Sequence, residues 1–189
     1  MNNNPSVEEI VLDMTKELNY RAHAEQFNIP VLNSLEVKES KNPQIVFLAS
    51  NSSYLEQLIS DGPVQEENFE DRVASSIEQT KTIMKTTKCE NVDQSFLFYQ
   101  DYDSALFHFK LYFQDTIMPV GDGKKAARTL IAYFVEPKMH DFYQFSLSIG
   151  PFPFPNDEFV LGKIDLENDL VTKQLTELMK LLLDNLSYK

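Results

Sequence analysis

The middle of the chain alternates between apolar and polar side chains, and this alternation predicts antiparallel strands. Apolar residues alternate with mostly polar ones from 105 to 114, and the same period of two recurs at 142–149; residues 128–136, between these two segments, are predicted to form a further strand. A β-strand points successive side chains to opposite faces, so each of the two alternating segments has one apolar face. Together with a strand at 95–100 and short connections, the pattern predicts a four-stranded antiparallel meander.

Helical spacing appears on both sides of the meander in the sequence. Residues 68–87 carry an apolar stripe, and Asn68 suits the cap position of that helix. Residues 170–186 carry a wide apolar face that needs a sheet to cover it, and five apolar residues at 45–49 predict a buried strand. These elements predict an α+β fold in which helices flank an antiparallel sheet, an α/β/α sandwich.

An additional helix is predicted at the N-terminus. Ser6 and Glu9 have the spacing of a capping box, and apolar residues follow at helical intervals, so the helix is expected over 6–27. The sandwich core is expected over 44–186. The connection between them is too short to separate two domains, so residues 1–189 are predicted to form a single domain.

Three shorter segments carry weaker patterns. The polar connection at 36–43 has room for a short edge strand. Residues 54–59 predict a short helix, which a turn signal at 61–63 ends. The last strand of the meander is expected to end at three closely spaced prolines, Pro151, Pro153 and Pro155.

The net charge of the chain indicates which kinds of molecule it can bind. The chain has 189 residues and a formal net charge of −12, which would repel nucleic acid and an anionic membrane surface. A protein partner with basic character is therefore expected, and binding to nucleic acid or membrane is not. The N-terminal residues do not resemble a secretory signal, and no stretch approaches the roughly 20 apolar residues of a membrane span, so we expect a cytoplasmic protein.

Motifs that carry chemistry are missing from the sequence. Cys89 is the single cysteine, and none of the three histidines has the spacing of a metal motif. Residues 121–125 read Gly-Asp-Gly-Lys-Lys, without the Ser or Thr and the helix that a phosphate loop needs, so they predict a hairpin loop. His140 is interpreted as a loop residue between two strands. We therefore expect no catalytic residues, no metal and no cofactor, and predict that the protein is not an enzyme.

Four apolar or aromatic residues are candidates for partner binding. Phe152 and Phe154 alternate with prolines, so their rings either cap the core or contact a partner. Leu106 and Tyr112 lie on the mostly polar face of a predicted strand, where they form a patch if no helix covers them.

Four segments give the chain a resemblance to a known superfamily. They are "PQIVFLAS", "ARTLIAYFV", "FYQFSLSI" and "DLVTKQLTELMKLLLDNL", within residues 44–186. This order of a strand, a paired hairpin and a closing helix resembles the PsbP-like and DcrB-like α/β/α sandwich superfamily. That group includes the photosystem II extrinsic subunit, a nuclear-import Ran-binding factor and bacterial DcrB-like proteins. The resemblance implies an assembly factor, adaptor or secretion chaperone that binds and does not catalyse.

The sequence therefore favours a non-catalytic protein-binding module and leaves two alternatives open. The first alternative is a small-molecule-binding protein or small enzyme, whose site would be assembled from side chains on the sheet face. The second is a structural protein that forms a homodimer or larger oligomer through its first or last helix. The residues of the enzyme alternative are Asp101, Asp103, His108, Lys110 and Tyr112.

Overall fold

The computed structural model describes residues 18–21, 27–32, 34–42, 44–51, 55–61, 68–137, 140–155 and 160–188. Within these residues, seven strands form an antiparallel sheet in the order β3 (Glu36–Lys38), β4 (Ile45–Asn51), β5 (Leu55–Asp61), β9 (Phe142–Phe154), β8 (Gly123–Val135), β7 (His108–Val120) and β6 (Phe96–Asp103). A smaller sheet has the order β1 (Leu18–Arg21), β2 (Phe27–Leu32) and β10 (Ser187–Tyr188).

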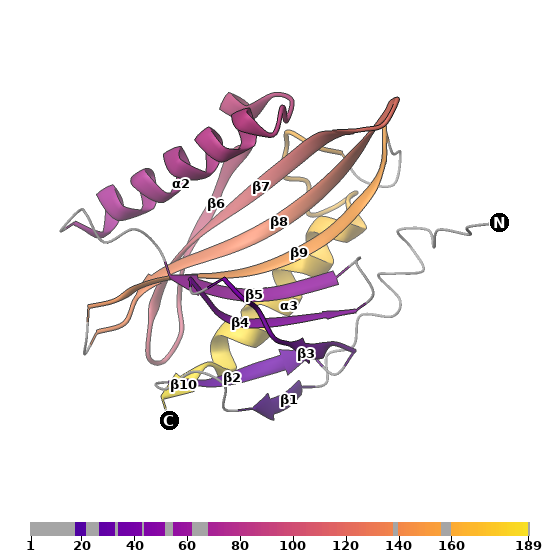
Figure 1. Ribbon diagram of the computed structural model, residues 1–189. Helices are drawn as coiled ribbons and strands as arrows, with labels where there is room; N and C mark the ends of the chain where they lie inside the picture. The colour runs from indigo at the N-terminus through magenta and orange to yellow at the C-terminus, as the bar shows by residue number, and fades with distance from the viewer. Residues whose placement is uncertain are drawn as a thin grey trace.

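Helices cover both faces of the larger sheet, which gives three layers (Figure 1). α2 (Phe69–Thr86) lies on one face, and α3 (Leu170–Asn185) lies on the other, beside β2 of the smaller sheet. A short 3-10 helix, η1 (Val92–Gln94), joins α2 to β6. The α+β class and the α/β/α sandwich predicted from the sequence are confirmed.

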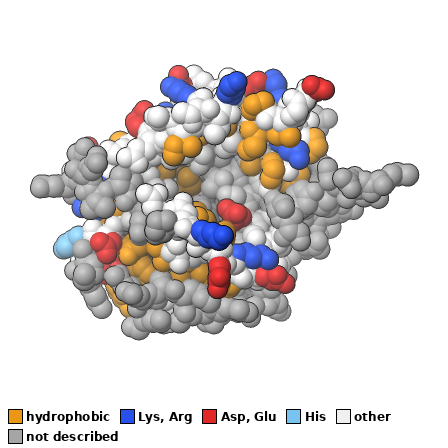
Figure 2. All heavy atoms as spheres, in the orientation of Figure 1, with side chains coloured by type: hydrophobic (Ala, Val, Ile, Leu, Met, Phe, Trp, Pro, Cys, Tyr) orange, Lys and Arg blue, Asp and Glu red, His pale blue; other side chains and the backbone are white. Residues whose placement is uncertain are grey.

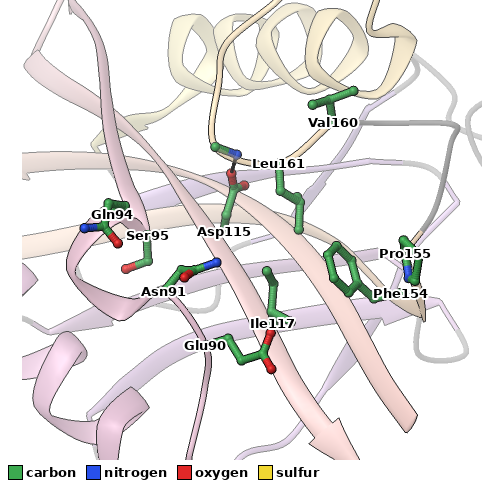
Figure 3. Close-up of a pocket in the computed structure, with 11 residues that line it drawn as sticks. Glu90, Asn91, Gln94, Ser95, Asp115, Ile117, Phe154, Pro155, Val160 and Leu161 are labelled. Carbon is green, nitrogen blue, oxygen red and sulfur yellow. Dashed lines mark hydrogen bonds between the residues drawn. The ribbon is translucent and has the colours of Figure 1, made fainter.

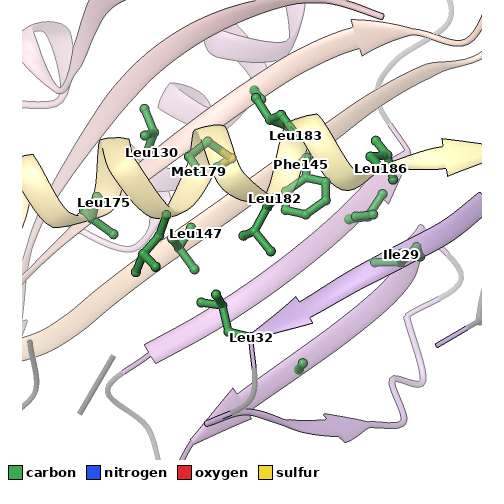
Figure 4. Packing of buried hydrophobic residues seen from close by; sticks show 14 of the residues in the cluster. Ile29, Leu32, Leu130, Phe145, Leu147, Leu175, Met179, Leu182, Leu183 and Leu186 are labelled. Carbon is green, nitrogen blue, oxygen red and sulfur yellow. The ribbon is translucent and has the colours of Figure 1, made fainter. Parts of the chain in front are cut away.

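The larger of the two cores lies between the sheet and α3 (Figure 4). The odd-numbered residues of β7 face this core, because the strand alternates, and Phe109, Leu111 and Phe113 are fully buried. α3 buries Leu175 and Leu182 against them, as its wide apolar face predicts. Each such side chain contributes roughly 1.5–3 kcal/mol when it leaves water, so this layer supplies much of the driving force for folding.

The smaller core lies between the sheet and α2. Val73 and Ile77 of the helix pack against Ile131, Tyr133 and Phe142 on the opposite set of strand residues. The helix begins at its predicted cap, where the Asn68 side chain accepts a 2.8 Å hydrogen bond from the backbone N–H of Glu70. No helix in the described part of the chain is long and apolar enough to cross a membrane.

β2 lies beside α3 and is joined to the larger sheet by a buried side chain. Gln57 of β5 donates a 2.6 Å hydrogen bond from Nε2 to the backbone carbonyl of Pro30. Its Oε1 accepts a 3.4 Å bond from the backbone N–H of Leu32. The smaller sheet therefore closes the edge of the α3-side core, beside Ile29 and Leu186 (Figure 4).

The meander and both main helices were predicted correctly. β6, β7, β8 and β9 are sequential neighbours in the sheet, β4 occupies the predicted buried strand, and β3 is an edge strand in the predicted polar connection. Residues 121 and 122 form the turn between β7 and β8, where Gly121 takes a φ of 59° that favours glycine. A hairpin turn is present as predicted, although residues 123–125 of the predicted loop belong to β8.

The predicted N-terminal helix is wrong where the structure can test it. Residues 18–21 form β1, which pairs with β2, and Phe27 begins β2 itself. The rest of the predicted helix, 6–17 and 22–26, lies outside the described residues. Antiparallel pairing with β2 overrides the helical spacing at 18–21, since strand formation depends on the partner strand more than on local preference.

The short helix predicted at 54–59 is also wrong. Residues 55–61 form β5, and Tyr54 lies outside the described residues. Leu55, Gln57 and Ile59 are all fully buried on the α3 side, so the true period is two, and the buried glutamine hid it. β5 pairs with β9 and thereby joins the N-terminal strands to the meander.

Two strand ends differ from their predicted positions. β9 continues through Pro151 and Pro153 to Phe154, because beyond Ile149 it pairs only with β8 among the described strands, and an edge position tolerates proline. The turn expected at 101–104 begins at Ser104, so β6 runs to Asp103 and Leu106 lies in the turn before β7.

Candidate functional site

A cavity of about 560 Å³ opens on the α3 side of the sheet, beyond the N-terminal end of α3 (Figure 3). It lies between the end of β7, the segment around η1, the end of β9 and the turn at 160–162. Its volume lies within the roughly 300–1,000 Å³ of typical ligand pockets. The residues that line it are Glu90, Asn91, Gln94, Ser95, Asp115, Ile117, Phe154, Pro155, Val160, Leu161 and Gly162.

The cavity has an apolar wall and a polar wall. Ile117, Phe154 and Leu161 converge on one side, and they come from β7, β9 and the 160–162 turn (Figure 3). The polar wall comes from the segment 90–95, which follows the edge of β7. Two backbone hydrogen bonds hold that segment to β7: Glu90 N–H donates to Ile117 O (2.9 Å), and Asp115 N–H donates to Ser95 O (2.8 Å).

Asp115 and Arg128 form a buried ion pair at the inner end of the cavity. They are direct cross-strand neighbours on β7 and β8. Arg128 donates from Nε to Asp115 Oδ1 (2.7 Å) and from Nη2 to Asp115 Oδ2 (2.8 Å), a bidentate geometry. The Arg128 side chain is completely buried, so this pair acts as part of the core.

The same guanidinium also holds the N-terminus of α3. Arg128 donates from Nη1 to Thr172 Oγ1 (2.6 Å) and to Asp169 Oδ2 (3.3 Å), and from Nη2 to the carbonyl of Lys163 (2.9 Å). Asp169 caps α3 by accepting a bond from the N–H of Thr172. Asp115 in turn accepts a 2.7 Å bond from the N–H of Gly162. One arginine therefore positions the turn that forms the cavity wall.

Both carboxylates that line the cavity are paired. Asp115 is neutralised by Arg128, and Glu90 lies 2.6 Å from the ammonium of Lys124 on β8. The polar groups that remain on the wall are neutral amides and a hydroxyl, from Asn91, Gln94 and Ser95. Among the described lining residues, none is a lysine, histidine, cysteine or unpaired carboxylate that could act as a base or nucleophile.

The structure separates the four residues predicted to bind a partner. Phe152 is 2% exposed and belongs to the α3-side core, so its ring caps the core, which is the first of the two alternatives, and is not available to a partner. Phe154 is half-buried and lines the cavity. Leu106 is 46% exposed in the turn before β7, and Tyr112 is half-buried on the α2 side. That Leu106, Tyr112 and Phe154 contact a partner stays a prediction.

The residues of the enzyme alternative do come together at the far end of the sheet. His108 Nδ1 lies 2.6 Å from Asp103 Oδ1, and His108 Nε2 lies 3.6 Å from Asp101 Oδ1. Lys110 donates a 2.7 Å bond to Glu70 of α2, and this bond raises the pKa of Lys110. A small hollow of about 260 Å³ next to them is lined by Phe69, His108, Val135 and Pro137.

This cluster is better described as a network of surface ion pairs than as a catalytic site. A lysine with a raised pKa is a poorer base, and burial raises the pKa of the Tyr112 phenol, which keeps it neutral. No group of three or more metal-binding side chains is found in the part of the chain that the structure describes. His140 is exposed in the loop between β8 and β9.

Asp115 and Arg128 were missed at the level of sequence, although a signal was present. Both fall in phase with the apolar positions of their strands, Asp115 after Phe113 and Arg128 before Leu130. A charged residue at a core position is costly unless it is paired, so two of them on neighbouring strands predict an ion pair. Polar loop residues such as Asn91 carry no comparable signal.

Comparison with known proteins identifies the fold. No family model matches the chain, and no curated protein matches it. A single-residue variant of protein Mog1 superimposes with a TM-score of 0.59 and 8% sequence identity, covering 90% of this chain and 95% of that chain. LpqN, involved in cell envelope biogenesis of Mycobacterium tuberculosis, is aligned over 100% of this chain and 99% of that one, with 8% identity and a TM-score of 0.38, which is too low to establish a shared fold. The chain therefore shares its fold with Mog1.

Proposed function

We propose that this protein is a non-catalytic binding module that takes apolar side chains of a protein partner into the cavity at Phe154. The observation that carries the proposal is the chemistry of the cavity. Its apolar wall is open to a ligand, while both of its carboxylates already have cationic partners within the protein. Such a surface can bury an apolar group and orient it with neutral hydrogen bonds, but it offers no free acid, base or nucleophile.

Exposed apolar surface at the cavity supports a protein partner. Val160 is 50% exposed, although it lies beside the apolar wall formed by Ile117 and Leu161. A partner that covered Val160 would bury it together with that wall, and burial of this kind is the main source of affinity at interface centres. The sequence resemblance to the PsbP-like superfamily implies a binding role, and the fold shared with Mog1 agrees with that resemblance. The net charge of −12 favours a partner with basic character.

The test is to purify the tagged protein from its native host and compare partners between two pairs of variants. Phe154→Ala removes part of the apolar wall, and Val160→Asp places a charge beside it. The matched controls are Phe98→Ala and Ile83→Asp, since Phe98 is 50% exposed on β6 and Ile83 is 62% exposed on α2, both away from the cavity. Phe152 is left unchanged, because truncating a buried ring would destabilise the core.

We expect mass spectrometry to find a specific partner with the unmodified protein and both controls, and to find it at about one tenth of that level or less with both cavity variants. Thermal unfolding of each variant checks that the fold is retained. Equal recovery of the partner with all four variants would place the interface elsewhere. A small molecule retained by the unmodified protein and lost from the cavity variants would move the assignment to a small-molecule-binding protein.

A further inference from the structure

The α2 side of the sheet is only partly covered by α2. The helix packs on the β6 to β9 half, and the β3 to β5 half has no described helix over it (Figure 1). A row of polar side chains crosses this half and continues onto β9 and β8 through direct cross-strand pairs. In order, the row is Glu36, Ser50, Glu56, Ser148 and Thr129, and the hydroxyls of the last two lie 2.8 Å apart.

A hollow of about 450 Å³ lies on this row. The described residues that line it are Ser50, Leu55, Glu56, Ser148, Gly150 and Pro151. In the space-filling view the surface is hollowed between α2 and the lower strands (Figure 2). Ser148 and Glu56 face the α2 side, whereas Phe154 lines the cavity on the α3 side, so the two sites are on opposite faces of the sheet.

Within the part of the chain that the structure describes, Glu56 of β5 forms no ion pair, unlike three other carboxylates on or beside the sheet. Glu36 pairs with Lys38, Glu70 with Lys110, and Glu90 with Lys124. No lysine or arginine in the described part of the chain lies within ion-pair distance of Glu56, and its cross-strand neighbours, Ser50 and Ser148, are neutral. The Glu56 residue is exposed, and partial burial of its carboxyl raises the pKa of that group.

We propose that this hollow binds an arginine or lysine side chain of a protein partner, with Glu56 as its counter-ion. A cation there would pair with a carboxylate that lies at the surface and forms no ion pair among the described residues. The hydroxyls of Ser50 and Ser148 can accept further N–H bonds from a guanidinium or ammonium group. The long-range attraction from a chain of net charge −12 would also speed the approach of a basic segment. This site uses none of the residues of the proposed function, so each can fail without the other.

The experiment titrates isotope-labelled full-length protein with short capped peptides and follows backbone amide shifts by NMR. The probe is Ac-Gly-Arg-Gly-NH2, and the neutral match is Ac-Gly-Gln-Gly-NH2. Ethylguanidinium serves as a free cation without a peptide backbone. The variant is Glu56→Gln, and Glu36→Gln is the control, because it removes the same charge from the same row at a carboxylate that already pairs with Lys38.

We expect the arginine peptide to shift the amides of Ser50, Glu56 and Ser148, and its affinity to fall about tenfold or more in Glu56→Gln but less than about threefold in Glu36→Gln. Binding should also lower the pKa of Glu56, followed by the carboxyl carbon shift, because the cation favours the ionised form. A merely structural glutamate would show no such change when the peptide is added.

Three results would overturn the proposal. The first is no specific shift up to about 50 mM peptide, a concentration at which even a weak side-chain site would be occupied. The second is equal affinity of the arginine peptide for the unmodified protein and Glu56→Gln. The third is binding of ethylguanidinium as tight as that of the peptide, which would assign the hollow to free cations and not to a protein partner.

Discussion

Arg128 is the residue on which the candidate site depends most. Its guanidinium joins β7, β8, the turn before α3 and the first turn of α3 through hydrogen bonds to four residues. A buried arginine is stabilising only when its hydrogen bonds are made. The acceptors of Arg128 lie on residues spread along the sequence between 115 and 172. The site is therefore maintained by one side chain that takes no direct part in binding.

Replacing Arg128 tests this role. Arg128→Met leaves the carboxylates of Asp115 and Asp169 buried without their cation, and we expect it to lower the free energy of unfolding by about 3–5 kcal/mol. Urea denaturation measures the change. Lys85→Met is the control, because Lys85 pairs with Asp93 on the surface, where loss of the pair should change stability little.

A double variant identifies the cause of that loss. If unpaired charge is responsible, Arg128→Met combined with Asp115→Leu should be more stable than Arg128→Met alone, since it removes one of the two stranded carboxylates. A double variant that is less stable than the single variant would mean that lost packing around Arg128, and not stranded charge, dominates.

The helices and strands of this fold were predictable where the pattern of apolar residues continued without interruption over about ten residues. α2, α3 and the strands of the meander each show a full apolar face, so local periodicity located them. β5 was mistaken for a helix because Gln57 interrupts its apolar face, and that glutamine is buried only because it hydrogen-bonds to the distant strand β2. Local sequence does not contain that contact.

Gln57 offers a test of how β2 is held. Gln57→Leu removes both hydrogen bonds to the backbone of β2 and leaves the buried carbonyl of Pro30 without this donor, so we expect a loss of about 1–3 kcal/mol. Hydrogen exchange should then accelerate at the amides of Ile29 and Leu32 while the amide of Leu111 in the sheet centre keeps its relative protection. Uniform acceleration at all three amides would show that β2 and the sheet open together and that Gln57 has no local role.

At the scale of the whole molecule, the two cores share one sheet. The α3-side core includes residues from β2, from the meander and from α3, so segments from near both ends of the chain contribute to it. The α2-side core uses the opposite faces of the same strands. Neither core can form without β8, whose residues Leu130 and Ile131 point to opposite sides.

This sharing predicts that the chain unfolds as one cooperative unit, as the single-domain prediction requires. The protein has 8 tyrosines and no tryptophan, so tyrosine fluorescence reports tertiary packing while far-ultraviolet circular dichroism reports backbone structure. The two signals should give the same urea midpoint. Separate midpoints would indicate that part of the chain is an independently stable unit, contrary to the prediction.

The sequence by itself determined which segments of the sandwich become regular elements, because the period of apolar residues is a local property that each segment carries alone. It also determined the acidic character of the surface, which follows from composition. Only the tertiary structure decided how β5 joins β9, how Asp115 meets Arg128 and why Glu56 has neutral cross-strand neighbours. These features depend on which strands pair and in which register, and that choice is made by long-range packing of whole faces against one another, which no short stretch of sequence contains.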